Sequence, residues 1–247
     1  MPAIATRAGA SARAYGFNSS SGPDIPTLGL QLYLDANNPT SYSGSGTTWK
    51  DLSGNNRNFT WTSNPSFNNS GIKYFNTNGY GAYGPASNSF GINNTSGYTF
   101  FFTMYQNGLA NTAGFKWYSS SSYGRGIFAH STWGDGTIYW DQGGCCGADT
   151  RTSVGLSSST GAWHVIGLRN NYSATNRTIW DNGSIITTNT SGIANINLSG
   201  TAANVGYTDE YGTGWNARIG QFVVYNRALS DTEMTTVTNK FKSKVGL

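Results

Sequence analysis

Short runs of β-forming residues alternate with glycine- and asparagine-rich turns along most of this sequence. The most complete unit is FAHSTWGDGTIYWD at 128–141, where an Asp-Gly turn is flanked by β-formers and Ile138 and Trp140 share one face. Glycine tolerates the positive φ that such turns need, so the pattern predicts a β-hairpin. Turn signals recur about every 8 to 12 residues with no helical stretch between the strands, which predicts an antiparallel sandwich.

The composition agrees with one large all-β domain. A sandwich can use the whole of a 247-residue chain as a single unit. Only 11% of residues are charged, whereas aromatic residues reach 14%, and this balance favours strands over helices. The 8 Trp, 15 Tyr and 12 Phe are enough to fill a sizeable core, which argues against disorder.

Two segments give the clearest strand predictions. In LGLQLYLDA at 28–36, leucine alternates with other residues at positions 28, 30, 32 and 34, which predicts a strand with one buried aliphatic face. The run YTFFFTMY at 98–105 is the strongest apolar run of the chain and predicts a central strand buried on both faces. Further strands are expected at 59–61, 72–75, 115–118, 163–169, 178–180, 185–186 and 217–225.

One helix is expected at the end of the chain, at about 230–244. Ser230 is placed as its N-cap, Glu233 completes a capping box, and Leu229 and Met234 form a hydrophobic staple. Gly246 follows the last turn. Lysines at 240, 242 and 244 suit the exposed carbonyls of a helix end, and without a basic and aromatic stripe they do not indicate nucleic-acid binding.

The first 27 residues form a separate segment that is too poor in apolar residues to fold alone. It is either a floppy tail or, as we favour, an extended arm that orders on a partner. The residue types that usually carry interface energy occur in it as Arg7, Arg13, Tyr15 and Phe17. The globular domain is then expected at 28–247.

The sequence contains no apolar run of about 18 residues, so no membrane-spanning helix is predicted. The N-terminus also lacks a continuous apolar region of the kind found in signal peptides, so synthesis in a cytoplasm without general secretory export is expected. The net charge of +4 is small and spread along the chain, which does not favour a nucleic-acid partner.

Cysteine and histidine give no clear catalytic set. Cys145 and Cys146 are adjacent and are expected to be free thiols in a tight turn, because a bond between neighbours strains the peptide. His130 and His164 are each expected to be hydrogen-bonded residues of a sheet. A dyad of one of the cysteines with His130 stays open, since spatial proximity cannot be read from sequence.

A resemblance to a known family rests on six segments, which are LGLQLYLDA, TTWKDLSGNNRN, HSTWGDGTIYWDQGGCCG, WHVIGLRNN, IWDNGSII and IGQFVVYNRALSDTEM. Together they resemble the laminin G-like, concanavalin A-like family, in the form found in tailed-bacteriophage virion proteins. The N-terminal segment also resembles leaders that precede such domains. The resemblance implies a jelly-roll sandwich of two antiparallel sheets, and it covers nearly all of the globular part.

The same fold class includes retaining glucanases, which need two carboxyl groups about 5 Å apart. This chain has only two glutamates, and Glu233 is explained by the helix cap. Glu210 follows Asp209 directly, so the two side chains would point to opposite faces of a strand. We therefore expect no catalysis. No glycine-rich phosphate loop precedes a helix, and no cofactor is expected.

Sugar binding is the better functional class, because aromatic faces stack on sugar rings and carboxylate or amide groups bind hydroxyls. The alternative is that the two tryptophans among the candidates pack on their own strands. Asp135, Asp209 and Glu210 are the acidic residues that a calcium site would use, but these positions lack a dense run of oxygen ligands and we expect no metal. The candidates are Trp133, Asp135, Tyr207, Asp209, Tyr211 and Trp215.

The resemblance leads to the hypothesis of a non-enzymatic phage virion protein, assembled in the host cytoplasm and mounted on the particle by residues 1–27. As a tail-fibre or adhesin domain it would bind a host-surface glycan. As a capsid decoration protein it would bind the shell. Either role implies capsid or tail proteins as partners and a homo-oligomer or lattice-bound state. A cellular glycan-binding module is the remote alternative.

Overall fold

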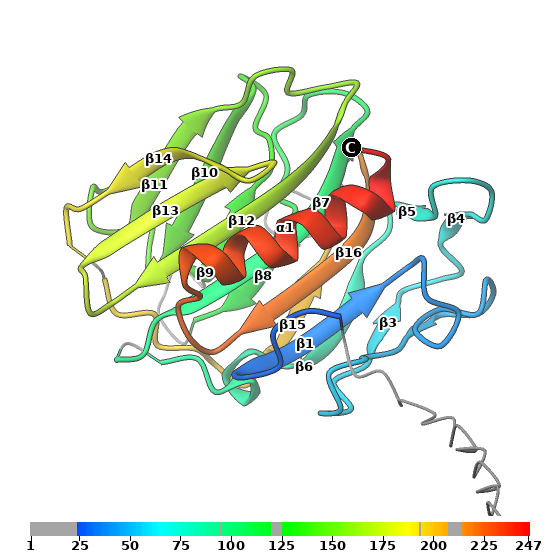
Figure 1. Cartoon of the computed structure of the whole chain (residues 1–247), viewed down its shortest axis with the longest axis horizontal. Coiled ribbons are helices and arrows are strands. Elements are labelled where there is room, and N and C mark those ends of the chain that lie inside the picture. The colour runs from blue at the N-terminus through cyan, green and yellow to red at the C-terminus, as the bar shows by residue number, and fades with distance from the viewer. Residues whose placement is uncertain (1–23, 94, 120–124, 193, 207–213) are drawn as a thin grey trace, which may run out of the picture.

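The computed structural model describes residues 24–93, 95–119, 125–192, 194–206 and 214–247. Within these residues, two antiparallel sheets of eight strands each pack face to face, and one α-helix crosses the outer face of the first sheet (Figure 1). The predicted jelly-roll sandwich with a C-terminal helix is confirmed.

The first sheet carries the helix α1 (Asp231–Val245). Seven of its strands form one continuous hydrogen-bonded order, and the eighth, β1 (Leu30–Asp35), pairs with β16 (Ala217–Tyr225) outside that order. The seven strands, in spatial order, are β14 (Ser184–Asn189), β13 (Asn176–Asp181), β12 (Trp163–Asn171), β7 (Tyr98–Gln106), β16 (Ala217–Tyr225), β5 (Tyr74–Asn76) and β4 (Ser66–Asn68).

The second sheet has no helix on its outer face among the described residues. A short 3-10 helix η1 (Ser87–Phe90), which the sequence analysis did not predict, follows β6. The strands, in spatial order, are β11 (Arg151–Gly155), β10 (Thr137–Gln142), β9 (Arg125–His130), β8 (Phe115–Tyr118), β15 (Ala202–Val205), β6 (Ala82–Ala86), β3 (Phe59–Trp61) and β2 (Thr48–Trp49).

Aromatic rings fill much of the space between the two sheets. Phe100 and Phe102 of β7 point into it, and Trp117 of β8 reaches it from the second sheet, with ring centroids of Phe100 and Trp117 5.0 Å apart. Phe101 faces the opposite way and packs against Phe241 of α1 at 6.4 Å. The strand β7 is therefore buried on both faces, as its largely apolar sequence predicted.

The helix α1 begins and ends as predicted. The Ser230 side chain accepts a hydrogen bond from the backbone N–H of Glu233 at 3.3 Å, and the Glu233 carboxylate accepts one from the backbone N–H of Ser230 at 2.9 Å. A hydrogen bond from Arg227 lowers the pKa of Glu233 to about 2. Gly246, with φ of 76°, closes the last turn. The capping box and the terminal glycine are confirmed.

The predicted single face of leucines in the first strand is wrong in part. Leu32 and Leu34 lie in the core between the sheets, but Leu30 packs with the cluster under α1, and Leu28 is 75% exposed. A register shift between Leu30 and Leu32 interrupts the alternation. The face expected to be open is also covered, because Tyr33 is buried beneath the helix with its ring 6.2 Å from Phe241.

The described end of the N-terminal segment packs on the domain. Ile25 is buried in the cluster under α1, and the Asp24 carboxylate forms an ion pair with Lys240. The Nζ atom of Lys244 lies 3.4 Å from the carboxylate of Asp35, so two of the lysines at the helix end have acidic partners. The proposed anchors Arg7, Arg13, Tyr15 and Phe17 lie outside the described residues, and the arm stays a prediction.

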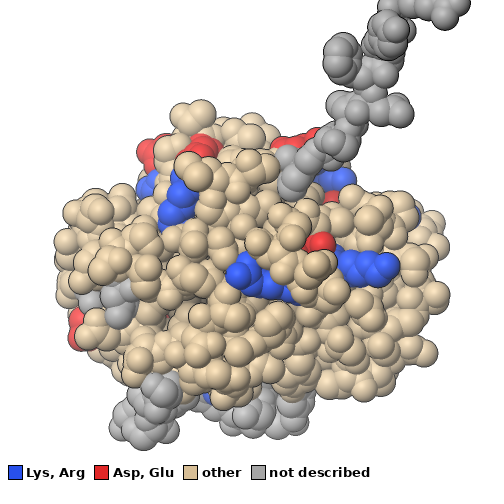
Figure 2. Space-filling model, turned by 90° about the horizontal axis from the view of Figure 1, so that it is seen from below, with Lys and Arg blue, Asp and Glu red and all other residues tan. Residues whose placement is uncertain are grey.

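Charged side chains on the face shown in Figure 2 are few and stand in small separate groups. The only α-helix in the described part of the chain, α1, lacks the length and apolar character needed to cross a lipid bilayer.

Candidate functional site

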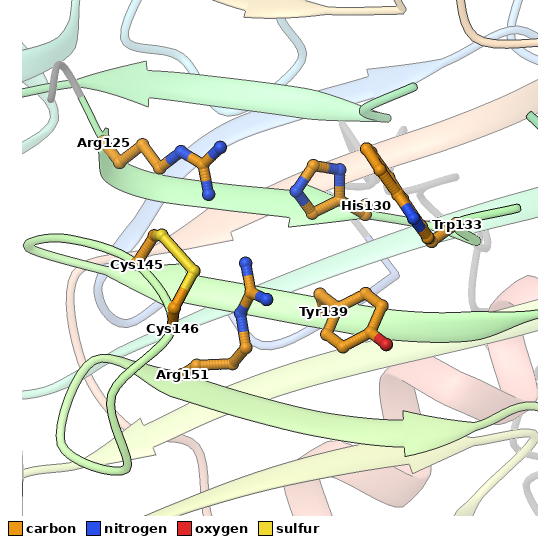
Figure 3. A pocket seen from close by; sticks show the side chains of 7 residues that line it. All are labelled: Arg125, His130, Trp133, Tyr139, Cys145, Cys146 and Arg151. Atoms are coloured by element: carbon orange, nitrogen blue, oxygen red, sulfur yellow. A yellow bond between two sulfur atoms is a disulfide. The ribbon is translucent and has the colours of Figure 1, made fainter. Parts of the chain in front are cut away.

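A pocket of about 280 Å³ opens on the outer face of the second sheet, over β9, β10 and β11. We call it the outer-sheet pocket. Figure 3 shows three aromatic rings at one end of it, and two guanidinium groups with a pair of bonded sulfur atoms at the other. Its lining residues are Arg125, His130, Trp133, Tyr139, Cys145, Cys146 and Arg151.

The predicted hairpin explains why these side chains share one face. The strands β9 and β10 pair antiparallel, with His130 opposite Tyr139, on either side of the Asp-Gly turn. Ile138 and Trp140 point into the core and are fully buried, so Tyr139 and Asp141 point outward, because side chains alternate along a strand. The hairpin and its two faces are confirmed.

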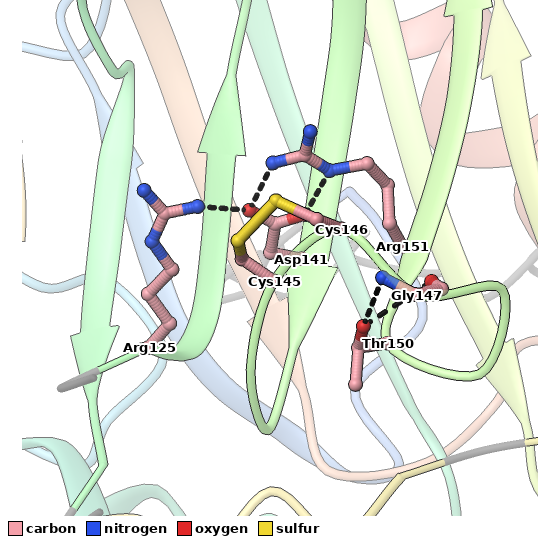
Figure 4. The surroundings of a disulfide bond; sticks show 7 residues. All are labelled: Arg125, Asp141, Cys145, Cys146, Gly147, Thr150 and Arg151. Carbon is pink, nitrogen blue, oxygen red and sulfur yellow. Dashed lines mark hydrogen bonds and ion pairs between the residues drawn. A yellow bond between two sulfur atoms is a disulfide. The ribbon is translucent and has the colours of Figure 1, made fainter. Parts of the chain in front are cut away.

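A buried ion triad forms the floor of the cationic end (Figure 4). The Asp141 side chain is fully buried and accepts a hydrogen bond from Arg125 Nη1 at 2.6 Å. From the other side, Arg151 donates through Nε at 2.5 Å and through Nη2 at 2.7 Å. The bonds from Arg151 to Asp141 raise the pKa of Arg151, and because there are two of them they fix the plane of its guanidinium.

The expectation of free thiols is wrong, because Cys145 and Cys146 are joined by a disulfide bond. The bond lies in the loop between β10 and β11, where it forms one wall of the outer-sheet pocket (Figure 3). The left-handed backbone of Cys146, with φ of 74°, belongs to the tight turn that the sequence did predict. A disulfide offers an apolar, uncharged surface, so this wall can pack against a ring.

The loop that carries the disulfide is fastened at both ends. The N–H of Gly143 donates to the carbonyl of Gly126 at 2.8 Å, and a β-carbon at Gly143 would lie 2.1 Å from the carbonyl oxygen of Asn195, so only glycine fits. Farther along, Arg177 of β13 donates to the carbonyls of Ala148 and Asp149 at 2.7 and 2.9 Å. The disulfide wall is therefore part of a fixed frame.

Aromatic rings form the other end of the pocket. Trp133, the candidate from the hairpin tip, stands with its ring centroid 4.6 Å from that of His130 and perpendicular to it. Tyr139 has the guanidinium of Arg151 over its ring at 4.6 Å. Beside the pocket, exposed Asp135 accepts a hydrogen bond from the Tyr139 hydroxyl at 2.8 Å, which lowers the pKa of Asp135 and raises that of Tyr139. Trp133 and Asp135 are thus brought to one side of the sheet, as the sequence suggested.

The other candidates are placed differently. Trp215 is 1% exposed, and its indole N–H donates to the carbonyl of Ser131 at 2.6 Å and to the side chain of Gln106 at 2.9 Å. A ring buried in this way offers no face to a sugar, so Trp215 is removed from the candidates. Tyr207, Asp209 and Tyr211, with Glu210, lie outside the described residues and remain predictions.

The two histidines are hydrogen-bonded residues of the sheets, as predicted. His130 donates from Nδ1 to the carbonyl of Thr112 at 3.0 Å, and burial lowers its pKa to about 4, so its ring is neutral at pH 7. Burial alone would lower the pKa of His164, but the hydrogen bond and charge of Asp181, 2.9 Å away, raise it. The open question of a cysteine and histidine dyad is answered, since the bonded sulfur atoms supply no thiolate.

Sequence reasoning missed the polar half of this pocket. Arg125, Tyr139 and Arg151 were not among the candidates, and β11 was not predicted at all. The available signal was the alternation in the hairpin, because Tyr139, the residue between buried Ile138 and Trp140, had to face outward. Nothing in the sequence indicated that Arg151 lies directly opposite Asp141 on the neighbouring strand.

No protein-family model matches this chain, and no curated protein matches its sequence. Solved structures with the same fold include a Trypanosoma rangeli sialidase, at 15% identity and a TM-score of 0.63 over 89% of this chain and 34% of that one. The binding domain of Paraclostridial Mosquitocidal Protein 1 matches at 18% identity and a TM-score of 0.63, over 86% of this chain and 52% of that one.

A third likeness is the binding domain of Botulinum neurotoxin DC in complex with rat synaptotagmin II, at 15% identity and a TM-score of 0.64, over 86% of this chain and 51% of that one. The chain thus spans about a third of the sialidase and about half of each toxin domain. At these identities the likeness is one of fold, and it places this chain among β-sandwich domains of the kind that the sequence predicted.

Proposed function

We propose that this chain is a non-enzymatic binding protein whose outer-sheet pocket holds one unit of a host-surface glycan. The observation that carries the proposal is the pairing of an aromatic end, formed by Trp133 and Tyr139, with fixed polar groups at the other end. Sugar sites need both, since ring faces stack on aromatic side chains while hydroxyls need hydrogen-bond partners. The volume of about 280 Å³ suits a small ligand.

The polar groups at this pocket support binding more than glycoside hydrolysis. A retaining glycosidase needs two accessible carboxyl groups about 5 Å apart. Asp141 is fully buried beneath two arginines, and Asp135 is engaged by the Tyr139 hydroxyl. His130, with its pKa near 4, is a poor general base at neutral pH. Two of the structures with the same fold are named as binding domains, which agrees with this proposal.

Trp133→Ala is expected to weaken glycan binding at least about tenfold, which corresponds to about 1.4 kcal/mol. The substitution removes a ring from the pocket wall but leaves the backbone bonds that Trp133 makes to Thr137 and Gly136. The purified protein would first be screened on an array of neutral and acidic glycans, and the strongest ligand would then be titrated by calorimetry into wild type and variant.

Two further variants control this experiment. Trp133→Phe keeps an aromatic face and should retain most of the affinity. Tyr172→Ala removes a ring that is 40% exposed beyond the end of β12, away from the outer-sheet pocket, and should leave binding unchanged. Absence of any glycan signal on the array would contradict the proposal, as would equal affinities for Trp133→Ala and Tyr172→Ala.

We further propose that the protein is part of a phage virion, as a tail-fibre or adhesin domain mounted by its N-terminal arm. The support is the resemblance of six segments to phage virion domains together with the aromatic and arginine residues at 7–17. Deleting residues 1–23 should release the protein from purified particles while the domain stays folded. Cryo-electron microscopy of both particles checks this, and unchanged density at its site after the deletion would contradict the role of the arm.

A further inference from the structure

The end of the outer-sheet pocket that holds the disulfide is rich in positive charge. Arg125 and Arg151 line it, and Asp141 is their carboxylate partner beneath. The triad therefore carries one more positive than negative charge. The neighbouring strand β8 adds Lys116 on the same face, with its Nζ 5.6 Å from the centre of the Phe128 ring. Neutral His130 does not change this sum at pH 7.

Arg151 is positioned so that part of its guanidinium remains available. Its Nε and Nη2 atoms both donate to Asp141, whereas Nη1 has no partner among the described residues. Figure 4 shows this third nitrogen pointing away from Asp141. The Arg151 side chain is 21% exposed and lines the pocket. Arg151 is thus fixed along one edge by the protein and presents two N–H groups to a ligand.

This arrangement suits an anion better than a hydroxyl. A guanidinium binds carboxylates through short, charge-assisted hydrogen bonds, which are about twice as strong as neutral ones. The buried Asp141 holds the plane of Arg151 in place, so little side-chain entropy is lost when a ligand binds. The Tyr139 ring under the same guanidinium restricts it further.

We infer that the preferred ligand is a sugar that carries a carboxylate, as sialic and uronic acids do, with the carboxylate bound by Arg151 and the ring lying between the disulfide and the aromatic end. This inference rests on the proposed glycan-binding function and specifies its ligand class. Carboxylate recognition then comes from a single arginine that Asp141 holds in place.

The test compares ligands that differ only in the acidic group. Sialylated oligosaccharides are paired with their desialylated forms, and uronic acid oligosaccharides are paired with carboxyl-reduced forms in which the carboxylate has become a primary alcohol. Affinities are measured by calorimetry with the intact wild-type chain. We expect at least one acidic ligand to bind about tenfold or more tightly than its neutral partner, and the two pairs distinguish sialic from uronic acid.

Salt gives a second measurement that needs no variant. Raising sodium chloride from about 0.05 to 0.5 M shortens the Debye length severalfold, so the advantage of the acidic ligand should shrink while the neutral partner is little affected. Arg151→Lys, which keeps the charge but not the planar fork, should weaken the acidic ligand more than the neutral one. Thermal melting of this variant shows whether it is folded.

The outcomes separate the two proposals. If the neutral partners bind as tightly as the acidic ligands in both pairs, the inference is overturned while glycan binding stands. If neither member of any pair binds, glycan binding itself fails and the inference with it. An acidic preference that Arg151→Lys leaves unchanged in a folded protein would also overturn the role given to Arg151.

Discussion

Replacing Asp141 by alanine is expected to lower the free energy of unfolding by about 3 kcal/mol or more. The substitution leaves Arg125 and Arg151 side by side without the carboxylate that both bind, and their side chains are only 11% and 21% exposed. The two guanidinium groups would then repel each other across the space left empty. Chemical denaturation of wild type and variant, with the midpoint and slope fitted together, measures the difference.

Asp141→Asn is the matched control. The amide fills the same space and keeps one acceptor oxygen, so the cost should be smaller than that of Asp141→Ala, although the charge is lost. In the alanine variant the outer-sheet pocket should also lose its ligand, because Arg151 no longer has a fixed position. A loss of less than about 1 kcal/mol in the free energy of unfolding for Asp141→Ala would contradict this stabilising role of the ion triad.

Trp117→Ala should lower the free energy of unfolding by about 3–5 kcal/mol. The indole ring is fully buried between the sheets, where its centroid lies 5.6 Å from that of Phe222 on β16 and 5.2 Å from that of Phe90 in η1. A single truncation there opens a cavity that both sheets line. Denaturant unfolding followed by far-ultraviolet circular dichroism gives the measurement.

Trp117→Phe controls for the ring itself. The indole N–H of Trp117 is buried without a hydrogen-bond partner among the described residues. Removing it relieves the free-energy cost of burying an unpaired donor, which partly offsets the packing lost with the smaller ring. We expect this variant to lose clearly less stability than Trp117→Ala. Equal losses for the two variants would contradict the account of the core.

The sequence predicted those helices, strands and turns that are specified by interactions between residues close together in the chain. The Asp-Gly hairpin follows from the turn chemistry of a few residues, and the start of α1 follows from Ser230 and Glu233, which lie three positions apart. The strand β7 was recognised because no polar residue interrupts its central run. In each case the deciding interactions lie within one segment, so the pattern contains them.

Interactions between distant segments could not be predicted in this way. The strand β15 pairs with β8 and β6, which precede it by many residues, and no local pattern specifies that order. The register shift in β1 moved Leu30 to the helix side, an effect that depends on its pairing with β16. A bulge of this kind overrides alternation without leaving a clear mark in composition.

In the candidate site, too, the residues set by local sequence were predicted and those set by contacts between distant segments were not. Trp133 and Asp135 were identified because they lie at the tip of a recognisable hairpin. Trp215 was chosen because it ends a stretch, 207–215, that combines aromatic and acidic residues, but the structure buries its ring and its indole N–H donates to Gln106 and Ser131. The disulfide was not predicted, because a bond between adjacent cysteines is rarely accommodated by the backbone, whereas the loop that follows β10 does accommodate it.

The most direct test of the binding account is a crystal structure of the wild-type protein with its strongest array ligand bound. We expect electron density for a sugar ring in the outer-sheet pocket, between Trp133 and the Cys145–Cys146 disulfide, with the acidic group of the sugar at Arg151. Density for the ligand on any other surface of the domain, with this pocket empty, would contradict it.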